Sequence, residues 1–170
     1  IEDELWHEEA RMQACYALSW VASDETMKKV VEKVGKFASK DKPRQQLIGA
    51  CYAGTLSRRP VPEAAGLMVD ALRPELEVNV RGALGHAIGV TGLEGQADAE
   101  KKLFAMLENP EIRNPAALAL ILGGSPDTAS RVVAMFADEQ KRDALPMLKD
   151  LYFRAFGYWS DKDLDRGTIY

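Results

Sequence analysis

Hydrophobic and polar positions follow two different helical patterns along the chain. In the first, apolar residues recur at i, i+3, i+4 and i+7 with charged residues between them, as in an amphipathic helix. The second is a segment of small and apolar residues nearly all round, which neighbouring helices must cover on most sides. Four segments follow the first pattern, at Met27, Val30, Val31 and Val34; at Ala65, Met68, Val69 and Leu72; at Ala99, Leu103, Met106 and Leu107; and at Ala129, Val132, Val133 and Phe136.

The second pattern recurs at a nearly constant spacing. Ala14-Cys15-Tyr16-Ala17 returns 36 residues later as Ala50-Cys51-Tyr52-Ala53. The same register falls on Ala83–His86 after 33 more residues, and on Ala117–Leu120 after 34 more. An arginine precedes each segment, at Arg11, Arg44, Arg81 and Arg113. A period of this length is typical of arrays of helical pairs, in which each pair buries its apolar face against the next.

These patterns predict an all-α chain, because no segment shows the strict alternation and hairpin signals of strands. We expect nine helices and no sheet, over residues 3–22, 24–39, 43–57, 62–73, 76–91, 97–108, 114–123, 126–138 and 142–159.

Proline, capping residues and glycine support these boundaries. Proline is tolerated in a first helical turn, and we expect Pro43, Pro62, Pro115 and Pro126 to lie at helix starts. Asn114 and Ser125 are expected N-caps, and Gly123-Gly124 is an expected left-handed stop. Three glycines on one helical face predict the close approach of another helix, at Gly82, Gly85 and Gly89.

Paired helices at this period, with an arginine opening an alanine-rich second helix, resemble HEAT repeats and, more loosely, the HEAT-like repeats named after phycobilisome lyases. The resemblance implies a right-handed α–α superhelix, or solenoid, of about four to five helical pairs. It places the repeat domain at residues 1–159 and a tail at residues 160–170. The resemblance rests on Arg11 with Ala14–Leu18, Arg44 with Ala50–Gly54, Arg81 with Ala83–Gly89, and Arg113 with Ala116–Gly123.

Length and charge narrow the class of protein. A chain of 170 residues is long enough to bury a core without disulfides, and its two cysteines, Cys15 and Cys51, cannot form the framework of a small secreted domain. We therefore expect a reducing, cytoplasmic location. The net charge of −4 makes nucleic acid an unlikely partner. No apolar run reaches the roughly 18–20 residues of a membrane span, so no membrane partner is expected.

No motif in the sequence indicates catalysis. His7-Glu8 resembles the start of a metalloprotease motif, but Arg11 stands where the second histidine would be needed, so we expect no metal. Cys15 and Cys51 share a register with leucines, which is typical of small buried side chains, and His86 is expected in the core. We predict no cofactor, no catalytic residue and no enzymatic activity.

The resemblance favours a non-enzymatic scaffold or adaptor that binds a protein partner on the groove lined by the second helices of the pairs. The candidate binding residues are Gln13, Tyr16, Trp20, Tyr52 and Thr55. Such side chains can instead fill the seams between repeats, and that alternative stays open.

A HEAT-like enzyme or lyase-type chaperone acting on a cofactor or nucleic acid is the alternative function. The candidate basic residues for binding nucleic acid are interspersed with the acidic residues Glu32 and Asp41, which favours a solvated helix face instead. These candidates are Lys28, Lys29, Lys33, Lys36, Lys40, Lys42, Arg44, Arg58 and Arg59.

Neither end of the chain has the polar character of a repeat cap. The first helix carries Leu5 and Trp6 without an amphipathic partner before it, and the last carries a dense aromatic cluster that includes Tyr158 and Trp159. Large exposed apolar patches mark contact surfaces. We expect the 170 residues to be a piece of a larger protein, or to pair end to end with another copy.

The helix assignment makes a first testable prediction. Far-UV circular dichroism of the full chain should show about two thirds helix or more, with no sheet component. A substantial strand signal would contradict the all-α assignment.

Overall fold

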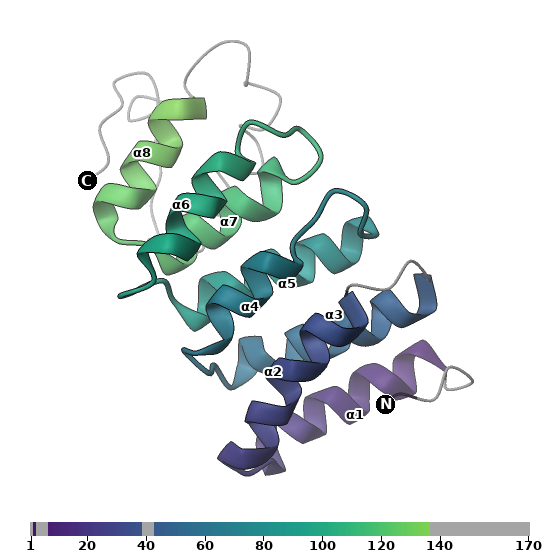
Figure 1. Ribbon diagram of the computed structural model, residues 1–170. Helices are drawn as coiled ribbons and strands as arrows, with labels where there is room; N and C mark the ends of the chain where they lie inside the picture. The colour runs from purple at the N-terminus through teal and green to yellow at the C-terminus, as the bar shows by residue number, and fades with distance from the viewer. Residues whose placement is uncertain (1, 3–6, 39–42, 137–170) are drawn as a thin grey trace.

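The computed structural model describes residue 2, residues 7–38 and residues 43–136, and within them it contains eight helices and no strand (Figure 1). All-α architecture is therefore confirmed for this part of the chain. The helices are α1 (Glu8–Val21), α2 (Asp24–Ala38), α3 (Pro43–Arg58), α4 (Ala64–Ala71), α5 (Val78–Thr91), α6 (Ala97–Met106), α7 (Arg113–Gly123) and α8 (Pro126–Phe136).

Eight of the nine predicted helices correspond to these eight in order. The largest difference is at the first helix, which begins at Glu8 with His7 as its exposed N-cap residue rather than at position 3. The ninth predicted helix, the aromatic cluster near Tyr158 and the predicted tail lie outside the described residues, as does Trp6.

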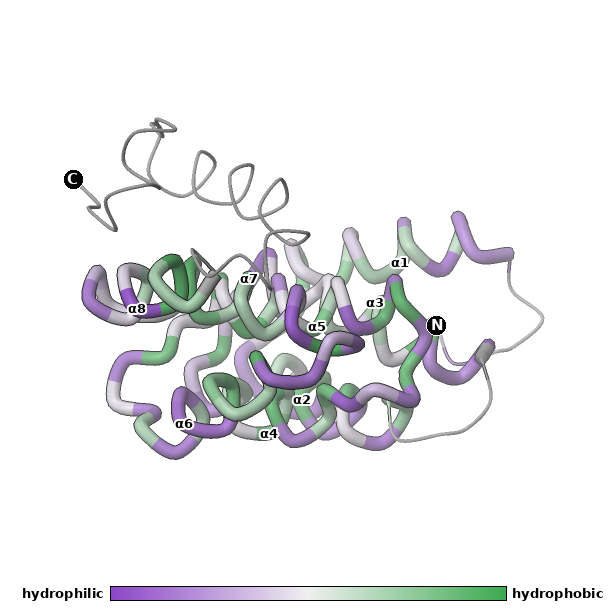
Figure 2. The backbone as a smooth tube through the Cα atoms, turned by 90° about the horizontal axis from the view of Figure 1, so that it is seen from above, coloured by the Kyte–Doolittle hydropathy of each residue, from purple (hydrophilic) through white to green (hydrophobic). Residues whose placement is uncertain are grey.

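The helices form two layers. The odd-numbered helices α1, α3, α5 and α7 pack side by side in chain order, while α2, α4 and α6 pack beside one another in the second layer (Figure 2). Each even helix also packs on the odd helix that follows it, in the pairs α2–α3, α4–α5 and α6–α7. The last described helix, α8, packs on α7. Residues about 35 apart in the sequence therefore lie in adjacent helices of one layer.

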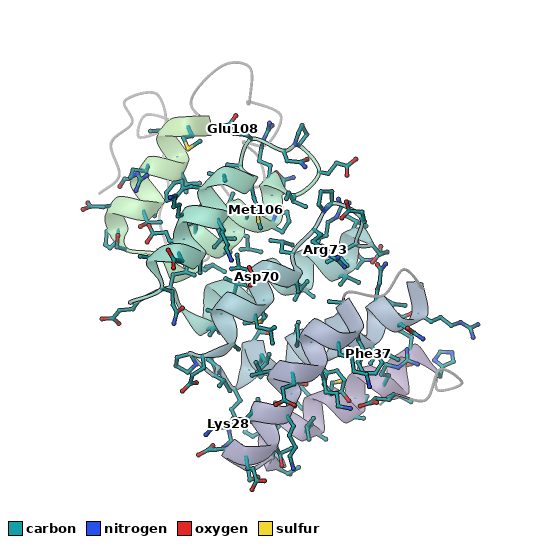
Figure 3. All side chains as sticks on the ribbon, viewed as in Figure 1. Lys28, Phe37, Asp70, Arg73, Met106 and Glu108 are labelled. Atoms are coloured by element: carbon teal, nitrogen blue, oxygen red, sulfur yellow. The ribbon has the colours of Figure 1, made fainter. Side chains whose placement is uncertain are left out.

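The even helices are amphipathic, as their pattern predicts. Their apolar stripes face the odd layer, and Met27, Met68, Leu72, Leu103 and Leu107 are almost completely buried. Their opposite faces carry exposed charges such as Lys28 and Asp70 (Figure 3). Val31 and Met106, also predicted for the apolar stripe, are only partly buried at its edges.

Helices α5 and α7 of the odd layer approach one another closely because several of their contact positions are glycine. A Cβ atom on Gly85 would lie 2.5 Å from the Pro115 carbonyl oxygen, and one on Gly89 would lie 2.7 Å from Leu122 Cβ. The predicted role of these two glycines is confirmed. For Gly82 the prediction is wrong within the described residues, since none of the helices they form lies within 4 Å of a Cβ added to this exposed residue.

Two of the predicted helix ends need correction. Ser125 does cap α8, because its Oγ accepts from the Thr128 backbone N–H at 3.1 Å, but Asn114 lies inside α7 and caps nothing. The residue that follows α7, Gly124, has φ −85°, so the predicted left-handed stop is wrong there. A left-handed glycine does follow α5, where Gly92 has φ 90°. A capping role that the pattern missed belongs to Glu77, whose carboxylate accepts from the Asn79 and Val80 N–H groups.

Arginines bind the ends of neighbouring helices and loops. Arg113 Nε donates to the Leu107 carbonyl oxygen at 2.9 Å, and Arg81 Nη1 donates to that of Pro74 at 3.0 Å. Arg59 binds the Ala22 carbonyl, just after α1, and Arg73 reaches the last carbonyl of α2. Because the final carbonyls of a helix have no intrahelical partner, these contacts satisfy groups that would otherwise need water. Two of the repeated arginines, Arg81 and Arg113, thus connect the two helices of a pair. Arg59 and Arg73 instead connect one pair to the segment before it.

The α5–α7 contact gives a matched pair of glycine substitutions. Gly85→Ala should lower the free energy of unfolding by about 2 kcal/mol, because the new methyl group meets backbone atoms that cannot move freely. Gly82→Ala on the same helix should raise it by about 0.5–1 kcal/mol through helix propensity alone. Urea unfolding followed by circular dichroism measures both. Equal effects of the two substitutions would contradict the packing described for α5 and α7.

Candidate functional site

Two adjoining cavities open on the odd layer and form what we call the α1–α3–α5 groove. The first has a volume of 260 Å³ and the second 440 Å³. They share Gly54, Arg58 and Ala83, and no even helix contributes to either one. The other lining residues are Glu8, Met12, Cys15, Leu47, Ala50, Cys51 and Asn79 in the first cavity, and Ser57 and His86 in the second.

The repeat register brings the two cysteines together in this groove. Cys15 on α1 and Cys51 on α3 both line the first cavity, and each thiol has the largest effect on the pKa of the other. Buried Thr55 lies at the same point, with its Oγ1 3.1 Å from the Cys15 carbonyl oxygen and 3.2 Å from that of Cys51. Cys15 is 3% exposed, as predicted for a small buried side chain, whereas Cys51 is only partly buried.

The contact between the thiols makes the two cysteines chemically unequal. The hydrogen bond from Cys51 lowers the pKa of Cys15 and outweighs the opposing effect of burial, with further help from the Thr55 hydroxyl and the Arg11 charge. The same hydrogen bond, together with burial, raises the pKa of Cys51 well above the ordinary thiol value. The first proton therefore leaves the pair from Cys15.

An exposed apolar row runs along α1 beside the groove. It consists of Met12, Tyr16 and Trp20, one helical turn apart, with exposed fractions of 52%, 45% and 73%. The Tyr16 and Trp20 ring centroids are 6.1 Å apart. The Arg58 guanidinium, from α3, lies 4.8 Å from the Tyr16 ring centroid and donates to the Gly54 carbonyl oxygen. Arg58 therefore connects the row to both cavities.

The predicted binding residues divide into two groups. Gln13, Tyr16 and Trp20 are exposed on α1, whereas Tyr52 and Thr55 are buried in the seams between helices. Tyr52 stacks on Phe37 and donates to Glu2 Oε1 at 3.1 Å; burial and this hydrogen bond raise its pKa. For Tyr52 and Thr55 the seam-filling alternative describes what is observed, so the groove surface does not include them.

His86 and most of the basic candidates do not lie where the sequence patterns place them or where the alternative function needs them, although Arg58 lines both cavities. His86 is exposed at the second cavity, so its predicted place in the core was wrong. Lys28, Lys29, Lys33 and Lys36 all lie on α2, in the other layer. Two of them meet acids there: Lys29 pairs with Glu25, and Lys33 Nζ lies 2.7 Å from Glu2 Oε1 and lowers the pKa of that carboxyl.

The described residues offer neither a metal site nor a membrane-spanning helix. This part of the chain contains no group of three or more His, Cys, Asp or Glu side chains placed to hold a metal ion. It also contains no helix of the length and apolar character needed to cross a bilayer.

Sequence reasoning missed most of the groove lining. Met12 and Arg58 carried signals that could have been used: Met12 precedes Tyr16 by four residues, and Arg58 follows Cys51 by seven, on one face of a helix. Ala83 shares the repeat register of Ala50, which also lines the first cavity, whereas Asn79 gave no signal, because its approach depends on how α5 packs against α3.

Comparison with known proteins identifies no relative: no family model, no curated protein and no solved structure matches this chain.

The unequal thiols predict an order of alkylation. As pH is raised toward the ordinary thiol range, iodoacetamide should modify Cys15 before Cys51, because the thiolate is the reacting species and the lower pKa gives Cys15 more of it. Exposure alone predicts the reverse order, since Cys51 is the more exposed residue. Peptide mass spectrometry distinguishes the two sites. Modification of Cys51 first would contradict the pKa assignment, and in denaturant both should react alike.

Proposed function

We propose that this chain is a HEAT-like scaffold or adaptor whose odd helices bind a segment of a protein partner in the α1–α3–α5 groove. The helical pairs α2–α3, α4–α5 and α6–α7, stacked in two layers, are the arrangement expected of a right-handed solenoid of this kind. In such an array the layer without a covering partner supplies the binding surface.

The observation that carries the proposal is the exposed row of Met12, Tyr16 and Trp20 against a groove. Large apolar side chains gathered on one exposed face are typical of contact surfaces, and Trp, Tyr and Arg dominate the energetics of protein interfaces. Arg58, on the neighbouring helix α3, packs its guanidinium over the Tyr16 ring. A ring already fixed in place loses little conformational entropy when a partner binds.

The dimensions and charges of the surface define the ligand. Met12 to Trp20 spans eight residues of helix, or about 12 Å, which matches two turns of a partner helix or about four residues of an extended segment. Glu8 and Arg58 in the first cavity can pair with a basic and an acidic side chain, respectively. The fitting partner is a short segment with one apolar face and mixed charge.

The catalytic alternative has weaker support in the described residues. A HEAT-like protein that grips nucleic acid needs a basic binding face, whereas the α2 lysines lie on the layer opposite the groove, among acidic neighbours. Enzymatic activity on a cofactor remains the second hypothesis, and the groove is where its substrate would bind.

Peptide display against the full chain tests the proposal. Selected peptides should carry apolar side chains at helical or alternating spacing, and their affinity should fall tenfold or more with Trp20→Ala and with Tyr16→Ala. Val78→Ala is the control, because Val78 is also an exposed apolar residue, at 64%, but lines neither cavity. The affinity of the Val78→Ala variant for the selected peptides should stay within twofold of the affinity of the wild type.

Two outcomes would contradict the proposal. The first is that selected peptides bind equally well to the wild type and to both α1 variants. The second is that titration calorimetry detects a single-stranded oligonucleotide, and no peptide, bound in the groove; this result would favour the alternative function.

A further inference from the structure

We propose that Cys15 and Cys51 form a dithiol site that hydrogen peroxide converts to a disulfide joining α1 to α3. The site is independent of the peptide-binding proposal, because it depends on the two sulfurs and their access to a small molecule. These are the only two cysteines of the chain, which makes the product simple to identify.

The first support is the proximity of the two residues. Both residues line the first cavity, and the single oxygen atom of Thr55 Oγ1 lies within 3.2 Å of both cysteine carbonyl oxygens. A disulfide requires Cα atoms about 4.4–6.8 Å apart. Helix axes 8–10 Å apart, with Cα atoms about 2.3 Å from each axis, bring facing Cα atoms to roughly 3.5–5.5 Å. The upper half of this range meets the requirement, so facing positions on packed helices can be joined by a disulfide.

The second support is access. Both cysteines line the 260 Å³ cavity of the groove, which is large compared with a peroxide molecule. Thiols buried in a continuous core are inert because no reagent reaches them. Here the cavity provides an entry path from the open face of the odd layer, and Arg58 on its wall can attract a small polar reagent.

The third support is that the pair supplies both a reacting and a resolving thiol. Because the Cys15 thiolate is favoured, Cys15 is the nucleophile. Its sulfur attacks one peroxide oxygen, the O–O bond breaks, and the departing hydroxide takes a proton to become water, leaving a sulfenic acid. The Cys51 sulfur, as thiolate, then attacks this sulfur, and the S–O bond breaks as a second water leaves. Two thiols are oxidised and one peroxide is reduced to two waters.

The cross-link would fasten the edge of the described array. Among the described helices, α1 makes its main packing contact with α3, whereas α3 and α5 each pack against several helices. A covalent bond between α1 and α3 closes a loop of 36 residues in the unfolded chain. Such a loop is long enough for a disulfide to stabilise the fold appreciably.

The experiment treats the reduced full chain with a few equivalents of hydrogen peroxide under native conditions. Intact mass should fall by two hydrogens, digestion should yield a Cys15–Cys51 linked peptide, and the chain should migrate as one chain on a non-reducing gel. The midpoint of thermal unfolding should rise by about 10 °C and return to its original value with dithiothreitol. The matched controls are Cys15→Ser and Cys51→Ser, neither of which should show the stabilisation.

A second probe requires no oxidant. Phenylarsine oxide, a trivalent arsenical, bridges two neighbouring thiols, so one equivalent should bind the wild type and survive an excess of a monothiol. Each serine variant should lose the bound arsenical in the same excess of monothiol. With Cys51→Ser, peroxide should leave a sulfenic acid on Cys15 that dimedone traps.

Three results would overturn the proposal: peroxide leaves both thiols free, it links cysteines only between separate chains, or the arsenical is retained equally by the wild type and both serine variants. Peptide binding is measured separately, on reduced protein, so its failure would not be confused with any of these results.

Discussion

The structure depends on the close approach of the odd helices, which only small residues at their contact positions allow. Gly85 and Gly89 of α5 lie against Pro115 and Leu122 of α7, and an added Cβ at Gly123 would lie 2.9 Å from the Gly89 carbonyl oxygen. Larger side chains at these points would separate the helices and expose the apolar residues between them. Leu84, Ile88 and Leu120 are completely buried because the helices stay in contact.

The layer arrangement explains why a groove forms where it does. The even helices bury their apolar stripes against one face of the odd layer, and the order of the described helices provides no equivalent cover for the other face. The α1–α3–α5 groove opens on that side, which no described helix covers. The repeat then determines what the groove contains: because Cys15 and Cys51 occupy the same register in successive repeats, adjacent helices place their sulfurs side by side. One sequence repeat thus underlies both the packing and the candidate chemistry.

Sequence patterning predicted the local structure well, because helical periodicity and proline act within a few residues. The stripe of Met68, Val69 and Leu72 and the start of α8 at Pro126 were found this way. Properties that depend on which helix faces which were not predictable. Gly82 and Gly85 look alike in the sequence, yet only Gly85 meets a neighbouring helix. Likewise, the exposure of His86 and the burial of Tyr52 are decided by helix rotation and by packing between repeats.

Hydrogen exchange of the full chain, read amide by amide, tests most directly whether the odd layer is the core of the fold. Helix α5 packs against α3, α4 and α7, so its central amides, around Leu84 and Ile88, should open only with global unfolding and exchange slowest. The amides of α2 and α6 should exchange through smaller, local openings, because each of these helices packs mainly against two others of the described helices rather than three. Slower exchange in α2 and α6 than in α5 and α7 would contradict the account.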